Sequence, residues 1–338
     1  MDSKLSSSQN FLERNTDDID LWQSFLADGR PLLLLTGIAL ALVGSFAIFL
    51  GLSGHFLPHD EKFLGMNAAQ LCGYHDCHIL HFMIHDRVAF GGAVVTVGLL
   101  YIWLVEFPLR AGEGWAWWGL VLSGAIGFLS FLAWLSYGYL DTWHGMATLC
   151  LLLCFTLGLI RSYQSIRPDS LRFIFQNHQQ PTLTVDRLAL LLTVLGLICA
   201  GIVILIGGST RVFVPQDLQF MKLTVGDLNA ISTRLVPLIA HDRAGFGGAL
   251  LSTGIAMGFC LWFGRMSRSL RQILFLAGST GFGCAIGTHF EVGYVNWVHL
   301  APALLGAAVF YIGLLLPSIT PFAQAASSSP KGGTGDWL

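Results

Sequence analysis

Two nearly identical stretches decide the fold: His85-Asp86-Arg87-Val88-Ala89-Phe90-Gly91-Gly92-Ala93 and His241-Asp242-Arg243-Ala244-Gly245-Phe246-Gly247-Gly248-Ala249. They share seven of nine residues and lie 156 positions apart. Two weaker matches have nearly the same offset: Gly138 to His144 with Gly293 to His299, and Pro58-x-Asp60-x-x-Phe63 with Pro215-x-Asp217-x-x-Phe220. Self-similarity at a fixed offset indicates a tandem duplication.

The composition around these stretches is that of a membrane protein. Of the 338 residues, 54% are hydrophobic and 11% are charged, and the mean hydropathy is +0.65. These values exclude a water-soluble globule and leave no room for a large catalytic domain outside the membrane. Eight apolar windows predict eight membrane helices, at 32–52, 79–105, 116–138, 143–163, 187–207, 236–263, 273–290 and 294–316.

Each copy therefore contains four predicted spans. An even number of spans makes the two copies parallel in the membrane. The predicted fold is an all-α polytopic membrane protein, with eight transmembrane helices in two parallel tandem four-helix bundles. Its predicted segments are a polar N-terminal segment 1–30, a first repeat 31–163, a linker 164–186, a second repeat 187–316 and a disordered tail 317–338.

The positive charges predict the orientation. Twelve of the 18 Lys and Arg residues fall on one side of the predicted spans, which places both termini in the cytoplasm and the 53–77 and 208–235 loops outside. The expected location is the inner, cytoplasmic membrane, with the lipid bilayer as the main partner. The net charge of -2 argues against a nucleic-acid partner.

Four repeated histidines are the strongest candidates for chemistry. His85 and His144 lie on the second and fourth helices of the first copy, and His241 and His299 occupy the same places in the second. All four are expected near the outer ends of their helices. We expect the two imidazoles of each half to face one another, as the axial ligands of a haem iron do.

Small residues accompany these histidines. Gly92 and Gly248 follow His85 and His241 by seven residues, on the same helix face, and would leave room for a flat macrocycle. The alternative is that the histidines form hydrogen bonds between helices and the glycines allow close packing. Arg87 and Arg243 lie at i+2, where each would pair with an aspartate, Asp86 or Asp242, or bind a lipid phosphate or a haem propionate.

The loop before the second helix adds further candidates. Cys72 and Cys77 predict a disulfide or a redox-active pair on the oxidising side. His75, His78 and His81 are either a metal or proton-relay cluster or histidines facing water at the interface. Three histidines, His55, His59 and His178, are interpreted as loop residues without repeated partners. His289 and Glu291 are a candidate proton-handling pair near His299, with solvated interface residues as the alternative.

The eight predicted helices, the four histidines and the Cys pair together resemble the haem A synthase family over most of residues 30–316. The resemblance implies that His241 and His299 hold a haem b as electron carrier. It implies that His85 and His144, with Asp86 beside them, line the catalytic or second-haem site. The family has a carboxylate one turn before the first histidine, where this chain has Phe82, and an Arg at the position of Asp86.

Three functions follow as hypotheses. The first is a membrane haem-binding oxidoreductase acting on a quinol or a haem-type substrate. The second is a cofactor-free proton-coupled transporter or channel, and the third is a non-catalytic subunit of a respiratory or photosynthetic complex. In the third, Trp115, Trp117 and Trp118 would anchor the interface.

Overall fold

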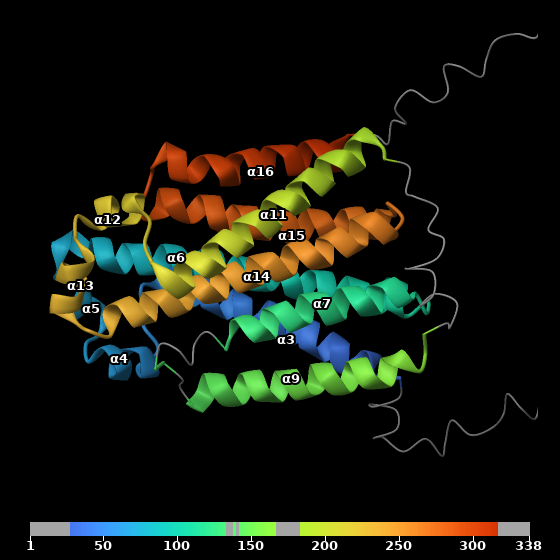
Figure 1. The fold of residues 1–338 in the computed structure, drawn as a ribbon, viewed down its shortest axis with the longest axis horizontal. Coiled ribbons are helices and arrows are strands. Elements are labelled where there is room, and N and C mark those ends of the chain that lie inside the picture. The colour runs from blue at the N-terminus through green and yellow to red at the C-terminus, as the bar shows by residue number, and fades with distance from the viewer. Residues whose placement is uncertain (1–27, 133–137, 140–141, 167–182, 317–338) are drawn as a thin grey trace, which may run out of the picture.

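The computed structural model describes residues 28–132, 138–139, 142–166 and 183–316. Every regular element in these residues is a helix, and the long helices run alongside one another (Figure 1). In chain order they are α3 (Arg30–Ser53), α6 (His78–Leu104), α7 (Gly114–Ser130), α9 (Thr142–Tyr163), α11 (Val185–Thr210), α14 (Leu235–Phe263), α15 (Arg268–Glu291) and α16 (Trp297–Leu315).

Seven of these helices are long and apolar enough to cross a membrane, among the residues described. α7 is also apolar but has only 17 residues. The chain is therefore a multi-pass, all-helical membrane protein, and an eighth span at α7 stays a prediction.

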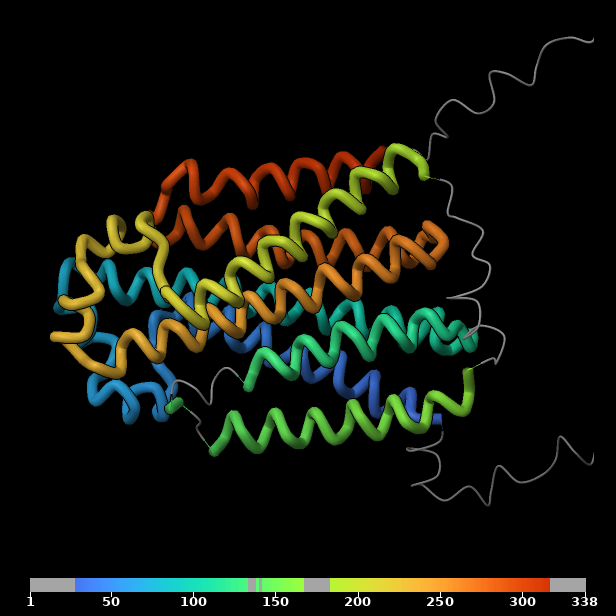
Figure 2. Tube along the Cα trace, in the orientation of Figure 1, coloured from blue at the N-terminus to red at the C-terminus, as the bar shows by residue number. Residues whose placement is uncertain are grey.

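Short helices gather at one end of the long ones, which we call the capped end (Figure 2). They are α4 (Pro58–Leu64), α5 (Ala68–Cys72), the 3-10 turn η1 (His75–Cys77), α12 (Pro215–Met221) and α13 (Val225–Ile231). The repeated Pro-x-Asp motif begins α4 and α12. Its aspartates, Asp60 and Asp217, accept hydrogen bonds from the backbone N–H groups of Leu57 and Val214, at 3.3 and 2.8 Å.

α6 and α14, which carry the His-Asp-Arg repeats, form the centre of the molecule and pack on each other. α3 and α15 also pack on α6, while α11 and α7 pack on α14. α16 contacts α15 and α11, and α9 contacts α3 and α7, so that each long helix packs on at least two others. The most apolar windows of α6 and α14 are 83% and 61% buried, against 28% or less for the other candidate spans. The two copies thus pack on each other through α6 and α14, and the predicted arrangement of two parallel tandem four-helix bundles is not confirmed.

Glycines allow the two central helices to approach their neighbours closely. A Cβ atom added at Gly91 of α6 would lie 2.7 Å from the carbonyl oxygen of Gly44 on α3. At the repeated position, a Cβ on Gly247 of α14 would lie 2.3 Å from the backbone nitrogen of Leu205 on α11. Such small-residue contacts are typical of helix pairs in membranes.

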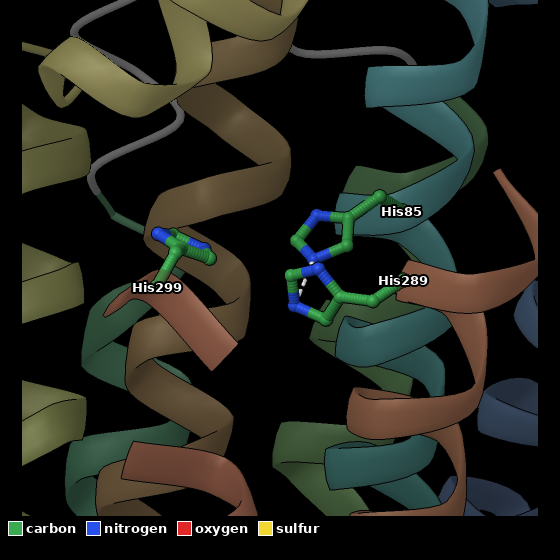
Figure 3. Close-up of side chains that lie close together, drawn as sticks. All are labelled: His85, His289 and His299. Atoms are coloured by element: carbon green, nitrogen blue, oxygen red, sulfur yellow. Dashed lines mark hydrogen bonds between the residues drawn. The ribbon is translucent and has the colours of Figure 1, made fainter. Parts of the chain in front are cut away.

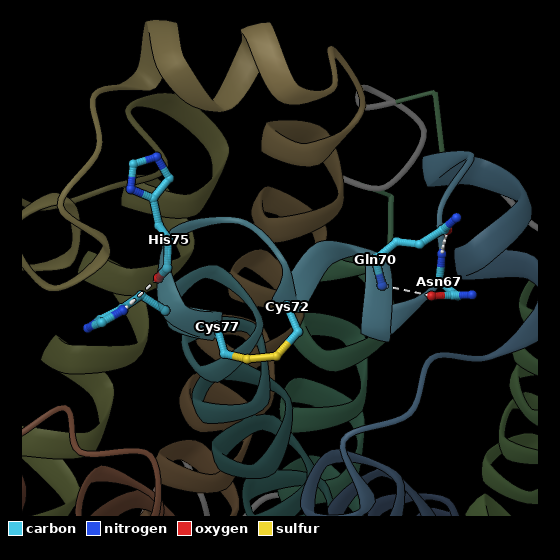
Figure 4. The surroundings of a disulfide bond; sticks show 6 residues. Asn67, Gln70, Cys72, His75 and Cys77 are labelled. Carbon is cyan, nitrogen blue, oxygen red and sulfur yellow. Dashed lines mark hydrogen bonds between the residues drawn. A yellow bond between two sulfur atoms is a disulfide. The ribbon is translucent and has the colours of Figure 1, made fainter.

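Cys72 and Cys77 form a disulfide at the capped end (Figure 4). The bond connects the last residue of α5 to the last residue of η1, directly before α6. The other five cysteines, Cys150, Cys154, Cys199, Cys260 and Cys284, are free thiols.

This pairing predicts a simple labelling result. Protein unfolded in detergent without reductant should react with five maleimides per chain, and with seven after reduction, because only free thiols react. Mass spectrometry of the intact chain measures both numbers. Seven adducts without reductant would show that the bond is absent from the protein.

Candidate metal centre

Three histidines from three helices meet at the capped end. His85 comes from α6, His289 from α15 and His299 from α16, and their imidazoles point into one space (Figure 3). One donor nitrogen from each lies within 4.8 Å of the others. His85 and His289 are buried, and His299 is half-buried. We call this group the first histidine cluster.

Hydrogen bonds fix the tautomers of two of these rings. Nδ1 of His85 lies 3.0 Å from a carboxylate oxygen of Asp86, and Nδ1 of His289 lies 2.8 Å from the backbone carbonyl oxygen of Tyr294. Both oxygens only accept, so each Nδ1 must donate a proton. In the neutral rings, both Nε2 atoms then carry lone pairs.

These two Nε2 atoms lie 3.0 Å apart. Two lone pairs at this distance repel unless a cation lies between them. The cation is either a proton, with one ring charged, or a metal ion. Metal-binding histidines almost always donate their other N–H to a carboxylate or a backbone carbonyl, as His85 and His289 do.

A buried chain of charges supports the first cluster. Arg243 of α14 donates to Asp86 at 2.8 Å and to Asp217 at 2.6 Å. Tyr294 donates its hydroxyl to Asp217 at 2.8 Å. The Tyr294 ring lies among the three imidazoles, with ring centroids 5.4, 5.3 and 5.1 Å from those of His85, His289 and His299.

The repeat generates a related arrangement on the other side of α6 and α14. Nδ1 of His241 lies 2.9 Å from Asp242, which pairs with Arg87 at 3.4 Å. Arg87 also pairs with Asp60, at 3.1 Å, and the hydroxyl of Tyr139 donates to the same carboxylate. Arg87 and Arg243 thus pair with aspartates, which was one of the predicted alternatives. Each arginine pairs with the aspartate of the His-Asp-Arg stretch in the other copy.

The repeated histidines also pair across the two copies. The His85 ring lies beside His299, with centroids 6.2 Å apart, and the His241 ring lies beside His144, with centroids 6.4 Å apart. The predicted neighbours were His85 with His144 and His241 with His299. The prediction assumed that each copy folds on itself, whereas α6 packs on α15 of the second copy and α14 on α7 of the first.

The two tyrosines between the spans, Tyr139 and Tyr294, have hydroxyl groups with strongly raised pKa values. Burial, together with the Asp217 carboxylate, raises the pKa of Tyr294 far above its ordinary value. Burial and Asp60 raise the pKa of Tyr139 in the same way. Both phenols therefore stay protonated and act as hydrogen-bond donors to these carboxylates at physiological pH.

The glycines predicted to leave room for a macrocycle are in helix contacts instead. A Cβ on Gly92 would lie 2.6 Å from the Cβ of Cys284 on α15. A Cβ on Gly248 would lie 2.2 Å from the Cβ of Ser130 on α7. Side chains of neighbouring helices thus occupy the space beside both glycines, which fits close packing better than a haem plane.

Two histidines that lie near the repeated ones, His289 and His59, were not assigned to a ligand site from the sequence. His289 is 4% exposed, so the solvated alternative for it is wrong. His59 lies 4.6 Å from His144 between ring centroids. Neither is repeated in the other copy, so the duplication gave no signal for them. The hydrogen bonds of Tyr139 with Asp60 and of Tyr294 with Asp217 could not be predicted either, because the two residues of each pair are 77 or more positions apart in the sequence.

The three loop histidines have a different place. Nδ1 of His78 contacts the backbone carbonyl of His75 at 2.7 Å, and its ring packs on Phe220. Within the described ranges, the three metal-type donors that converge are those of the first cluster, rather than His75, His78 and His81.

Comparison with family models, curated proteins and solved structures gives no match for this chain. The site is therefore interpreted from its own geometry.

Proposed function

We propose that this protein is an integral membrane metalloprotein and that His85, His289 and His299 bind a transition-metal ion at the capped end. The observation that carries the proposal is the 3.0 Å separation of two Nε2 atoms whose Nδ1 atoms both face acceptors. With metal–nitrogen bonds of about 2 Å, neighbouring ligands of one ion have nitrogens roughly 3 Å apart.

The third histidine favours a metal over a shared proton. A proton needs only two nitrogens, whereas His299 brings a third donor within 4.8 Å of both. Imidazole ligands suit zinc, copper, iron and nickel. Three protein ligands leave a coordination position open, which is the pattern of catalytic rather than structural sites.

Oxidoreduction is the chemistry that we propose for this centre. Copper or iron in a site of three imidazoles can exchange electrons. The chain itself supplies Asp86 and the Tyr294 carbonyl to orient the ligands, and buried helix faces to exclude water. A quinol, one of the two substrate classes predicted from the sequence, is the electron donor that we propose for this centre; the other class is a haem-type substrate.

A haem protein is the second candidate. The centroid separations of 6.2 and 6.4 Å in the two crossed pairs are compatible with imidazoles on opposite sides of one iron. The packing at Gly92 and Gly248 argues against it. Binding of a haem b, and of a second haem, stays a prediction. An optical spectrum distinguishes a bound haem from a bare metal ion.

The other two hypotheses stay predictions, and two features of the structure do not favour them. α6 and α14 are continuous helices through Gly91-Gly92 and Gly247-Gly248, so the broken helices typical of transporters do not occur at these positions. Trp115 is 7% exposed, and Trp117 donates to the Leu159 carbonyl at 2.9 Å. These two side chains make contacts within the bundle, which favours a structural role for them.

The disulfide supports the predicted orientation as part of this proposal. Cys72–Cys77 lies at the capped end, and disulfides persist on the oxidising side of a membrane. The metal centre would then lie near the outer face of the cytoplasmic membrane, with both termini inside.

Metal content of the purified protein tests the proposal. We expect that the chain, purified in mild detergent and washed with a weak chelator, retains a transition metal, and that His289→Ala lowers the content by about one ion per chain. His78→Ala is the matched control, because His78 lies on α6 outside the first histidine cluster, with its Nδ1 at the His75 carbonyl and its ring on Phe220. Inductively coupled plasma mass spectrometry gives the stoichiometry.

Equal metal content in the wild-type chain and His289→Ala would contradict the proposal. A Soret band that disappears in His85→Ala would replace it by the haem candidate.

A further inference from the structure

The second histidine cluster, on the other side of α6 and α14, reproduces the first in its supporting contacts. Each begins with a histidine whose Nδ1 faces the next aspartate, at 3.0 Å for His85 and 2.9 Å for His241. Each aspartate pairs with the arginine of the other copy, and each arginine reaches a second aspartate of the capped end. The duplication has thus preserved a complete support for one oriented imidazole on each side.

A tyrosine ring packs against the histidines of both clusters. Tyr139 has ring centroids 6.3, 6.5 and 4.6 Å from those of His59, His144 and His241. Tyr294 also lies beside three histidines, at the more even centroid distances of 5.4, 5.3 and 5.1 Å. Each tyrosine is fixed by an aspartate at its hydroxyl. Both clusters therefore contain three imidazoles beside a phenol. Among the described residues, the donor nitrogens of the first cluster all lie within 4.8 Å of one another, and those of the second are less closely gathered.

The third imidazole comes from different elements in the two clusters. In the first it is His289 of α15, and the residue 155 positions earlier is Trp134. In the second it is His59 of α4, and the repeated Pro-x-Asp motif has Gln216 at that place. Neither third histidine was copied by the duplication, yet each cluster contains one.

We propose that His59, His144 and His241 form a second transition-metal site, distinct from the first. This inference rests on the proposed function only for the class of ligand, a metal ion that prefers imidazole nitrogen. His59 and His289 are not related by the duplication, yet each brings the number of imidazoles on its side to three. A common requirement for three nitrogen donors explains this.

The second site differs from the first in its access. His59 belongs to a seven-residue helix of the capped end and is half-buried, whereas His289 lies on a long helix and is buried. His144 is half-buried at the start of α9. Because His59 is less buried than His289 and lies on a short helix, the metal of the second site should exchange faster than that of the first.

Titration with Cu²⁺ after removal of bound metal tests this inference. We expect two ions per wild-type chain by mass spectrometry and two Cu²⁺ signals by electron paramagnetic resonance. His59→Gln, which introduces the residue of the other copy, should remove one signal and about one ion while the other signal stays unchanged. His289→Ala should remove the other signal. His55→Gln is the matched control, because His55 is an exposed residue of the same loop.

The outcomes separate the two proposals. One ion per chain that is lost in His289→Ala and kept in both His59→Gln and His241→Ala overturns the second site and leaves the first. One ion lost in His59→Gln and kept in His289→Ala supports the second site and overturns the first. No bound Cu²⁺ overturns both, and a haem band that His241→Ala removes overturns a bare ion at the second site.

Discussion

Replacing Gly247 with valine is expected to separate α14 from α11 and to leave little folded protein in the membrane. A Cβ at this position would lie 2.3 Å from the backbone nitrogen and 2.7 Å from the Cα of Leu205. Backbone atoms cannot move aside as a flexible side chain can, so the cost should reach or exceed the ~3 kcal/mol upper range of ordinary overpacking. The yield of monodisperse protein on size-exclusion chromatography measures the effect.

Gly207→Val is the matched control for that experiment. Gly207 lies on α11, and a Cβ added to it meets nothing within 4 Å. This variant should behave as the wild-type chain does. If both variants gave the same yield as wild type, the close contact between α11 and α14 would be wrong.

Replacing Arg243 with leucine is expected to have the second large effect. Arg243 pairs with Asp86 and Asp217, which are 2% and 0% exposed, so its removal leaves two buried carboxylates without their cation. Breaking a buried ion pair typically costs about 3–5 kcal/mol. The expected fall in the midpoint of thermal unfolding in detergent is of the order of 10 °C.

Two further variants identify the cause of that loss. Arg211→Leu, at the exposed end of α11, removes a positive charge without a buried partner and should change the midpoint little. Adding Asp217→Asn to Arg243→Leu should recover part of the lost stability, because one uncompensated charge is gone. If Arg243→Leu had the same unfolding midpoint as the wild type, the ion pairs of Arg243 with Asp86 and Asp217 would contribute nothing to stability.

The same charges connect the two histidine clusters. Asp86 orients His85 and pairs with Arg243, while the neighbouring residues Arg87 and Asp242 do the same for His241. All four charged residues lie on the two central helices. Arg243→Leu should therefore weaken metal retention in the first cluster as well as stability, since Asp86 loses a partner that holds it beside His85.

Much of the helical architecture was predictable from the residues. The composition and the eight apolar windows indicated a helical membrane protein, and each window coincides with a long helix of the structure. The exception is the length of α7, whose 17 residues leave that span as a prediction. Window positions are reliable because they depend only on local hydrophobicity.

The arrangement of those helices was predicted less well. The duplication indicated two parallel tandem four-helix bundles. The absence of a side chain at Gly92 and Gly248 lets α15 and α7 pack closely on the central helix of the other copy. A repeat shows that two segments have the same local structure. It does not show whether each copy packs on itself or on its neighbour.

For this protein, the sequence alone determined the membrane character, the duplicated His-Asp-Arg stretches and the helices that carry the four repeated histidines. Those features depend on residues close together in the chain, where composition and periodicity apply. Only the tertiary structure decided that His85 lies with His289 and His299, that His241 lies with His144, and that Arg87 and Arg243 exchange aspartates. These contacts join residues more than 90 positions apart, and they follow from how whole helix faces fit together.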